Sequence, residues 1–136
     1  FVDYLQSIFF YFFGINWQIY ILHASIINAV LAIATFIVLI NFKLNINYSF
    51  FYALFFSILA YPSSGTPFVD HHSAFFSLLG IYSLILGIQK EEKKYWISLP
   101  IFFIFAFLSK QVPASYIILS TIFILLFYTI IQKKYI

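Results

Sequence analysis

The sequence predicts an all-α, polytopic membrane protein, and three observations carry this prediction. Of the 136 residues, 64% are hydrophobic and only 8% are charged, which leaves too little polar surface for a water-soluble domain. The apolar residues form long uncharged stretches, separated by short clusters of lysine, asparagine, serine and proline. The chain has no cysteine, so disulfides and thiolate metal sites are excluded. We expect about five transmembrane helices plus an N-terminal interfacial helix, forming a single domain over residues 1–136.

The first segment, residues 1–14, is predicted to be a helix that lies at the membrane surface. Asp3, Gln6 and Ser7 fall on one side of an otherwise aromatic and aliphatic stretch, the pattern of an interfacial amphipathic helix. Gly14 then favours a break before the first span. A truncated transmembrane helix is the alternative for so short a segment.

The remainder of the chain divides into five apolar segments at its charges and turn formers. A spanning helix needs roughly 20 predominantly apolar residues. The second span ends where Pro62 begins a proline- and serine-rich turn, and Ser109–Pro113 divides the long stretch 95–135 into two helices. The second and fourth spans are short enough for a re-entrant helix to be the alternative. The expected transmembrane helices cover residues 17–41, 48–61, 73–89, 95–109 and 113–132.

The lysines predict how these segments are oriented. Five consecutive crossings place six of the seven lysines on one side, which the positive-inside rule assigns to the cytoplasm. The Lys90–Lys94 loop would then be cytoplasmic, whereas the Pro62–His72 loop and Lys110 would face outward. The use of lysine alone among basic residues, with abundant phenylalanine, isoleucine and asparagine, favours an AT-rich bacterial genome. We therefore expect a periplasmic outer face and a location in the bacterial inner membrane.

The first span carries a stripe of small and polar side chains that includes Ala24, Asn28, Ala32 and Thr35. Such residues allow another helix to approach closely and to hydrogen-bond across the contact. The stripe is predicted to be a packing face inside a helical bundle. His23, near the outer end of the same span, is interpreted as a packed histidine before it is considered as a ligand.

The first candidate site is the run Asp70-His71-His72, which a turn-forming loop brings to the mouth of the third span. A carboxylate with two imidazoles at the membrane surface suits recognition of a polar or phosphorylated substrate. The alternative is helix capping by Asp70 or Ser73. Adjacent histidines point to different sides of a helix, so a divalent metal would need ligands from elsewhere. No metal site is predicted, and no other cofactor is implied.

The second candidate site is Lys110-Gln111, which apolar residues enclose on both sides. An ionisable group in such surroundings is a functional hypothesis by default. Pro113 favours a helix break there, so that the side chain and backbone amides could converge on a phosphate. Snorkelling of Lys110 to the interface and a salt bridge to Asp70 are the alternatives.

These residues, in this order, resemble the GT-C glycosyltransferases that use polyprenyl-phosphate donors. The resemblance is closest to the protein mannosyltransferase and aminoarabinose transferase branch. It is carried by the interfacial helix, the sequence of spans, Asp70 in the outer loop, the Lys-rich turn before Tyr95-Trp96, and Phe107-Leu108-Ser109-Lys110-Gln111. It implies an enzyme that moves a hexosyl or pentosyl group from a polyprenyl-phosphate-linked sugar to a lipid, glycan or protein acceptor at the periplasmic face.

In this family Lys110 would match a basic residue that contacts the donor phosphate, and the Asp70-His71-His72 loop would help to form the donor or acceptor site. The family's catalytic acidic residue normally lies in the first outer loop, which would precede Phe1 in a longer protein. We therefore expect the chain to be a fragment, with Asp3 as a minor candidate for the base. The absence of arginine departs from the usual bidentate phosphate clamp.

Two other classes of function remain open at this point. A transporter or channel-like subunit would use Lys110, Asp70 and the histidine pair His71/His72 to line a path for anions or protons. A structural membrane subunit would use the same groups only as caps and snorkelling side chains. A nucleic-acid partner is excluded because the net charge of +3 is spread too thinly to form a basic footprint. The sequence has no Walker loop, dinucleotide fingerprint or serine elbow.

Overall fold

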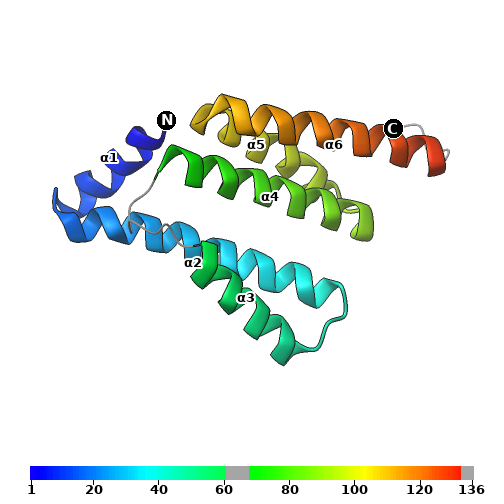
Figure 1. The fold of residues 1–136 in the computed structure, drawn as a ribbon, viewed down its shortest axis with the longest axis horizontal. Helices are drawn as coiled ribbons and strands as arrows, with labels where there is room; N and C mark the ends of the chain where they lie inside the picture. Colours follow the sequence, from blue (N-terminus) through cyan, green and yellow to red (C-terminus); the bar gives the residue numbers. More distant parts are fainter. Residues whose placement is uncertain (61–67, 133–136) are drawn as a thin grey trace.

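The computed structural model describes residues 1–60 and 68–132 and confirms the all-α class (Figure 1). Helices α1 and α2 are joined at Gly14, whose positive φ of 86° suits a residue without a side chain. Pro113 falls in the first turn of α6, where its missing N–H costs no helical hydrogen bond. Within the described ranges the elements are α1 (Val2–Phe13), α2 (Trp17–Asn41), α3 (Ile46–Ala60), α4 (Val69–Lys90), α5 (Lys93–Ser109) and α6 (Gln111–Gln132).

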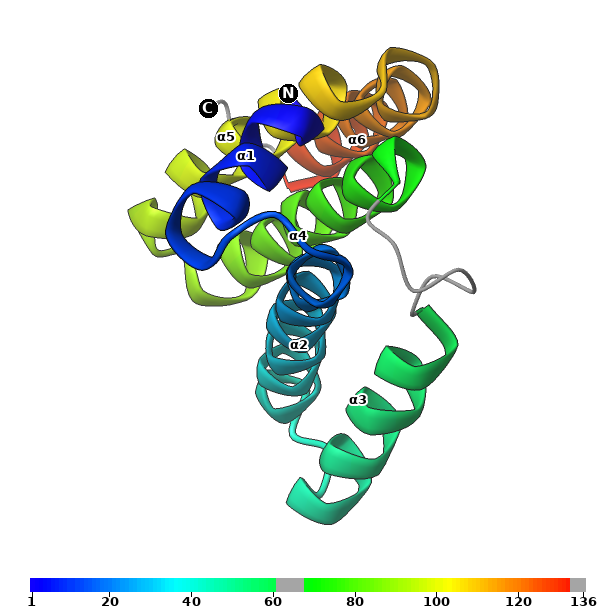
Figure 2. The same ribbon diagram turned by 90° about the vertical axis from the view of Figure 1, so that its left-hand side faces the viewer.

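Helices α2, α4 and α6 run in one direction, and α3 and α5 run in the opposite direction (Figure 1). At one end the Gln89 amide donates to the Asn41 carbonyl over 2.6 Å, which ties the last turn of α4 to that of α2. Lys43 and the Lys90–Lys94 turn therefore share this end of the bundle. The first turns of α2 and α4 and the α5–α6 junction gather at the other, which we call the α1 end because α1 covers it (Figure 2).

In residues 1–60 and 68–132, three helices, rather than five, are long and apolar enough to cross a membrane: α2, α4 and α6. Helix α3 has 15 residues and α5 has 17, so at 1.5 Å per residue they extend only about 22 and 25 Å. By this criterion three of the about five expected spans are confirmed, and the two that were expected to be short, 48–61 and 95–109, fall below the required length. The reason is that α3 lies in the short apolar stretch between Lys43 and Pro62, and α5 lies in that between the Lys90–Lys94 turn and Lys110.

Helix α4 begins at Val69, four residues before the expected start of the third span. Asp70, His71 and His72 thus lie in its first turn and not in a loop. The expected Pro62–His72 loop was therefore wrong for residues 69–72, which are helical. A carboxylate in the first turn of a helix is favoured by the helix dipole. The rest of that loop, 62–67, lies outside the described residues.

Two apolar clusters hold the bundle together, and α4 contributes to both. One joins α2 to α4 through Ile27, Leu31, Phe75 and Leu79. The other joins α4 to α5 through Leu84, Leu99 and Phe103. Gly80 lets α5 approach closely, because a Cβ atom at this position would lie 2.6 Å from Cε1 of Phe103.

Polar side chains add hydrogen bonds between helices. Asn28 donates to the carbonyl and the hydroxyl of Ser57, over 2.8 and 3.0 Å, and so ties α2 to α3. The hydroxyls of Thr35 and Tyr82 lie 2.8 Å apart and tie α2 to α4. Both α2 residues belong to the small and polar stripe seen in the sequence, which is consistent with its use as a packing face.

The turn between α4 and α5 presents charge away from the α1 end. Glu91 adopts the left-handed conformation with φ 54° and ends α4. The hydrogen bond from Lys94 holds the pKa of the exposed Glu92 carboxyl below its usual range. The Lys94 ammonium also lies 4.9 Å from the ring centroid of Tyr95.

Helix α1 folds back along the start of α2 and reaches across to α4 and α5 (Figure 2). Phe1 stacks on Phe105 at a centroid distance of 5.4 Å and also meets Phe76. The outward side of α1 carries large aromatic side chains, with Tyr11 83% exposed. This amphipathic arrangement is suited to a membrane interface.

Candidate functional site

Lys110 forms the junction between α5 and α6. Its backbone is extended, with φ −154° and ψ 120°, and it is the only residue between the end of α5 at Ser109 and the start of α6 at Gln111. The Lys110 amide still donates to Ala106, and its carbonyl accepts from the Ser73 hydroxyl over 3.3 Å. The junction is therefore anchored to the first turns of α4, so the ammonium is presented from a fixed corner.

Asp70 faces this corner and pairs with Lys110. The distance from Nζ of Lys110 to Oδ1 of Asp70 is 2.5 Å, and the two side chains are 43% and 65% exposed. No side chain caps α4 at Phe68, so Asp70 does not act as the cap. Of the alternatives considered for Lys110 and Asp70, the salt bridge is the one the structure contains.

A cavity of about 450 Å³ lies beside Lys110, lined by Phe107, Leu108, Ser109, Lys110, Gln111 and Val112. Gln111 is exposed, so its side-chain amide adds polar capacity next to the ammonium. Both polar residues of the second predicted site thus border one cavity. The anion that the Lys110 ammonium binds in this structure is the Asp70 carboxylate.

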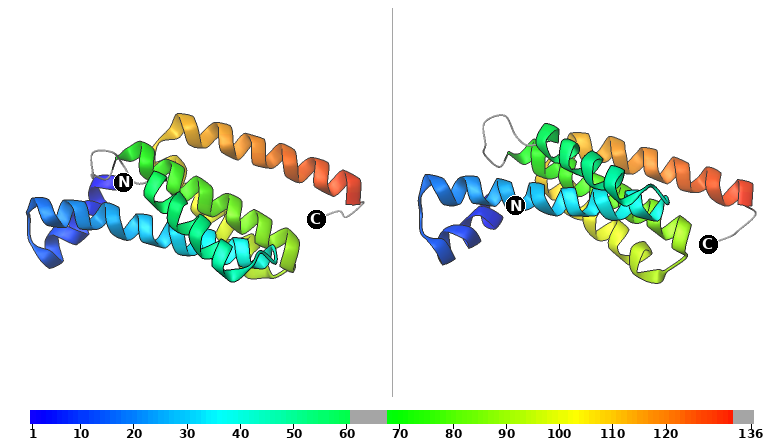
Figure 3. Two further views of the ribbon diagram at one scale, coloured as in Figure 1. Left: turned by 60° about the horizontal axis from the view of Figure 1, so that its bottom comes forward. Right: turned by 90° about the horizontal axis from the view of Figure 1, so that it is seen from below.

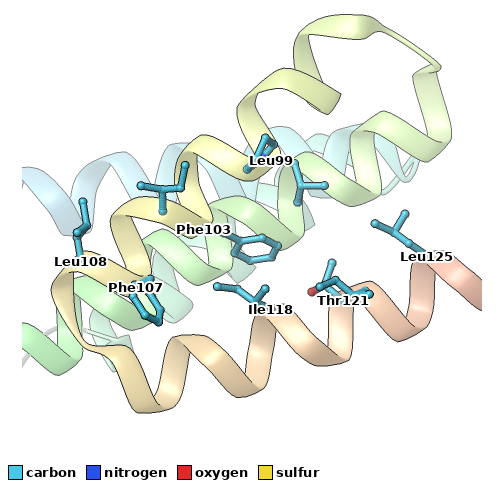
Figure 4. Close-up of a pocket in the computed structure, with 10 residues that line it drawn as sticks. Leu99, Phe103, Phe107, Leu108, Ile118, Thr121 and Leu125 are labelled. Atoms are coloured by element: carbon cyan, nitrogen blue, oxygen red, sulfur yellow. The ribbon is translucent and has the colours of Figure 1, made fainter. Parts of the chain in front are cut away.

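An apolar groove of about 410 Å³ runs between α5 and α6 and shares Phe107 and Leu108 with the cavity beside Lys110. Figure 4 shows the α5 side chains, such as Phe103, facing those of α6 across the groove. Thr121 is its one polar lining residue, and the Thr121 hydroxyl donates to the Ile117 carbonyl over 2.8 Å. The groove exists because α6 diverges from the other helices toward its C-terminal end (Figure 3).

The histidines of the predicted site do not converge on Lys110. His72 turns toward α2, where its Nε2 lies 3.2 Å from Nε2 of His23, and its Nδ1 bonds the Phe68 carbonyl over 2.9 Å. Each residue of a helix turns about 100° from the one before it, so the side chains of Asp70 and His72, two positions apart, lie on nearly opposite faces of α4. The ring nitrogens of His71 are buried and have no hydrogen-bond partner among the described residues.

His23 continues this chain to α1. Its Nδ1 lies 2.7 Å from Oε1 of Gln6, and its ring stacks on Phe9 at a centroid distance of 4.6 Å. Gln6, His23 and His72 are 6%, 1% and 0% exposed. His23 is therefore a packed histidine, as the sequence indicated.

Asp3 is exposed on α1, and no described contact joins it to Lys110 or Asp70. No group of three histidine, aspartate or glutamate side chains in residues 1–60 and 68–132 could hold a metal ion. The described part of the chain thus offers a cation beside an apolar groove, and it assigns no metal ligands.

Two features of this region escaped the sequence reasoning. The first is the groove, which depends on the angle between α5 and α6. The second is the role of Gln6, which was taken only as part of a polar face. The available signal was its spacing of four residues from the apolar Val2, which places both side chains on one face of a helix.

Comparisons of the chain with protein-family models, with curated proteins and with solved structures found no match.

Proposed function

We propose that this chain belongs to an integral membrane glycosyltransferase that moves a sugar from a polyprenyl-phosphate donor to an acceptor at the outer, periplasmic face. Lys110 binds the phosphate of the donor, and the groove between α5 and α6 takes the prenyl chain. The observation that carries the proposal is that a cavity lined by Lys110 and an apolar groove share Phe107 and Leu108 in their walls.

The ligand that fits this arrangement is amphiphilic. The groove offers almost only hydrocarbon side chains, because its single hydroxyl is already bonded within α6. A hydrocarbon chain gains contact there without leaving a polar group unpaired. The adjacent cavity offers the Lys110 ammonium and the Gln111 amide, which suit an anionic head group.

The salt bridge of Lys110 to Asp70 is compatible with binding of a phosphate. An ion pair between partly exposed side chains contributes only about 1 kcal/mol or less. A phosphate with several oxygens can make stronger charge-assisted hydrogen bonds to the same ammonium. Asp70 therefore acts as an internal counterion that the donor displaces.

In sugar transfer the bond between the anomeric carbon and the phosphate oxygen breaks, and the negative charge remains on the lipid phosphate. A cation placed against that oxygen stabilises the charge as it develops. The acceptor must also lose a proton to a base. We assign to Lys110 the stabilisation of the leaving phosphate, and we assign the base to no residue of this chain.

The orientation follows from the separation of the lysines. Lys43 and the Lys90–Lys94 turn lie at one end, and Lys110 lies at the α1 end. By the positive-inside rule, this separation supports an orientation in which the α1 end, with the site, faces the periplasm. The aromatic outer side of α1 would rest at the lipid interface there.

A transporter or channel path through Lys110, Asp70 and the histidines has less support. Asp70 faces the α5–α6 junction, whereas His72 faces α2 and bonds His23. A path lined by all of them would have to pass through the packed first turn of α4.

The experiment uses the whole protein in lipid nanodiscs and measures binding of radiolabelled polyprenyl phosphate. Lys110→Gln should weaken binding by at least about tenfold, since a hydrogen bond to a charged group contributes about 1.5–3 kcal/mol. Lys43→Gln, which removes a lysine from the opposite end, is the matched control and should leave binding unchanged. Phosphatidic acid as competitor separates a prenyl-phosphate site from general attraction to anionic lipids.

Equal binding by wild type and Lys110→Gln would overturn the assignment of the donor phosphate to Lys110. Equal competition by phosphatidic acid and polyprenyl phosphate would show that the protein binds anionic lipids in general, and it would contradict a specific donor site. Transfer of a labelled sugar from a polyprenyl-phosphate donor, lost in Lys110→Gln and retained in Lys43→Gln, is the result expected of the enzyme.

A further inference from the structure

A second cluster of chemistry-bearing side chains lies at the α1 end, apart from Lys110. It is the hydrogen-bonded chain from Gln6 on α1, through His23 on α2, to His72 on α4 and the Phe68 carbonyl. All three side chains are buried. Nothing in the proposed sugar transfer uses them, because the chain points away from the α5–α6 junction.

The direction of each hydrogen bond can be worked out from its fixed end. A carbonyl oxygen only accepts, so Nδ1 of His72 carries a hydrogen. A neutral imidazole has one N–H, so Nε2 of His72 is an acceptor. Nε2 of His23, 3.2 Å away, must therefore donate, and a neutral His23 then has a bare Nδ1.

A bare Nδ1 on His23 would face Oε1 of Gln6, another acceptor, over 2.7 Å. Two arrangements relieve this conflict. In one, the Gln6 amide turns over and Nε2 donates to Nδ1. In the other, Nδ1 of His23 takes up a proton from water and donates to Oε1. Nε2 of Gln6 is buried and has no hydrogen-bond partner among the described residues, so either orientation leaves one amide atom unpaired.

The same geometry limits the chain to one extra proton. A second would place N–H groups on both facing Nε2 atoms, which are 3.2 Å apart, and both groups would be donors. The contact between His23 and His72 could not survive this. The neutral state and the one-proton state, by contrast, both keep every link of the chain.

We propose that the Gln6–His23–His72 chain is a binding site for a single proton, and that the orientation of the Gln6 amide follows its occupancy. Glutamine suits this position because its side chain can donate in the neutral state and accept in the protonated state. Helix α1 therefore stays attached to α2 through the first protonation. A second proton breaks the His23–His72 contact, which joins α2 to α4.

Other titratable groups lie on the helices around the site. The ring centroid of His71 is 6.0 Å from that of His72 on the same helix. Asp3, three residues before Gln6 on α1, is exposed, and the Lys110 charge is paired with Asp70 at the α5–α6 junction. Among the described residues His71 is the neighbouring imidazole, whose signals would overlap those of the pair, so the experiment removes it.

The experiment is ¹⁵N NMR of the whole protein in lipid nanodiscs, with labelled histidine rings and the background substitution His71→Gln. In the neutral state the two remaining histidines should be opposite tautomers, with hydrogen on Nε2 of His23 and on Nδ1 of His72. On acidification His23 should become doubly protonated first, while Nε2 of His72 stays bare. The same tautomer in both, or simultaneous double protonation of both rings, would overturn the proposal.

Variants of Gln6 separate proton binding from simple packing. In Gln6→Glu the carboxylate can only accept, so His23 should remain doubly protonated at pH 8, where wild type has the neutral pair. Gln18→Glu, an exposed glutamine on α2, is the matched control and should leave His23 neutral. A neutral His23 in Gln6→Glu would contradict the link between amide orientation and proton occupancy.

The attachment of α1 can be followed independently, since the chain has no cysteine. A spin label on Ser7→Cys, an exposed position of α1, should keep its mobility through the first protonation, because the Gln6–His23 hydrogen bond remains. Mobility that rises with the first protonation would show that the one-proton state does not hold α1.

Discussion

The Asp70 carboxylate lies 2.5 Å from the Lys110 ammonium and joins the first turn of α4 to the single residue between α5 and α6. The Ser73 hydroxyl, which donates to the Lys110 carbonyl, holds the same corner from one turn farther along α4. The lysine is thus fixed by its backbone, and its side-chain partner can be exchanged. This distinction underlies the first prediction.

Asp70→Asn should increase the affinity for polyprenyl phosphate. Without the carboxylate the ammonium has no counterion to lose, and the gain is limited by the small free energy of an exposed ion pair. We expect an increase of up to about fivefold, equivalent to about 1 kcal/mol. Binding of the labelled lipid in nanodiscs measures it, with Asp3→Asn as the matched control. Weaker binding in Asp70→Asn would show that Asp70 assists the head group instead of competing with it.

Leu108→Trp should weaken binding of the same lipid, because the larger side chain would occupy space in the wall that the cavity beside Lys110 shares with the apolar groove. Leu108 lines both, and it is 54% exposed, so the larger ring causes little strain in the folded protein. Leu119, equally exposed at 53% on α6, lines neither. Leu119→Trp is therefore the control. Equal affinities in the two variants would contradict the placement of the prenyl chain in the groove.

Gly80→Ala should narrow the groove from its inner side. The new methyl group would lie 2.6 Å from Cε1 of Phe103, and Phe103 lines the groove, so the ring can yield in that direction. We expect the free energy of unfolding to fall by about 1 kcal/mol, the lower end for overpacking, and lipid binding to weaken. Unfolding in mixed detergent micelles measures the first effect.

The double variant Gly80→Ala with Phe103→Leu provides the check on that interpretation. A smaller side chain at position 103 should restore lipid binding, because the methyl group no longer displaces a ring into the groove. Gly87→Ala, whose methyl group would lie 3.2 Å from Trp96, should leave lipid binding unchanged. Binding that stays weak in the double variant would point to a shift of α5 as a whole.

The helices could be predicted from the sequence because their breaks are local. Lys43 follows an uncharged stretch, and Gly14 interrupts an aromatic one. The start of α4 was misplaced because Asp70, His71 and His72 are compatible with a loop and with a helical first turn. Only the packing of His72 against α2 decides between them.

The candidate site was predicted in its parts and not in its assembly. The sequence indicated an ionisable group at Lys110 and allowed a salt bridge to Asp70, but it could not choose between this bridge and a helix cap. Gln6 and His23 are 17 positions apart, and His23 and His72 are 49 apart. No local pattern pairs such distant residues, because their contact depends on how three helices pack.

The hydroxyl pair of Thr35 and Tyr82 should couple α2 to α4 in the interior of the bundle. Their oxygens lie 2.8 Å apart, and Thr35 also donates to the Leu31 carbonyl over 2.8 Å. Since the threonine hydrogen is used within α2, Tyr82 is the donor between the helices. Tyr82→Phe then leaves Thr35 with its own helical bond, whereas Thr35→Val leaves the tyrosine hydroxyl without its acceptor.

Thr35→Val should therefore destabilise the protein more than Tyr82→Phe does. A double-variant cycle of unfolding free energies in micelles should give a coupling of about 0.6 kcal/mol, and at most about 1.7 kcal/mol, the range for hydrogen bonds between membrane helices. Asn41→Ala combined with Tyr82→Phe serves as the uncoupled control, because Asn41 lies at the end of α2. A coupling near zero would mean that the tyrosine finds another acceptor when Thr35 is removed. In the interior of the bundle the α2–α4 contact would then depend on the apolar cluster of Ile27, Leu31, Phe75 and Leu79, with Gln89–Asn41 and His72–His23 as the polar links near its two ends.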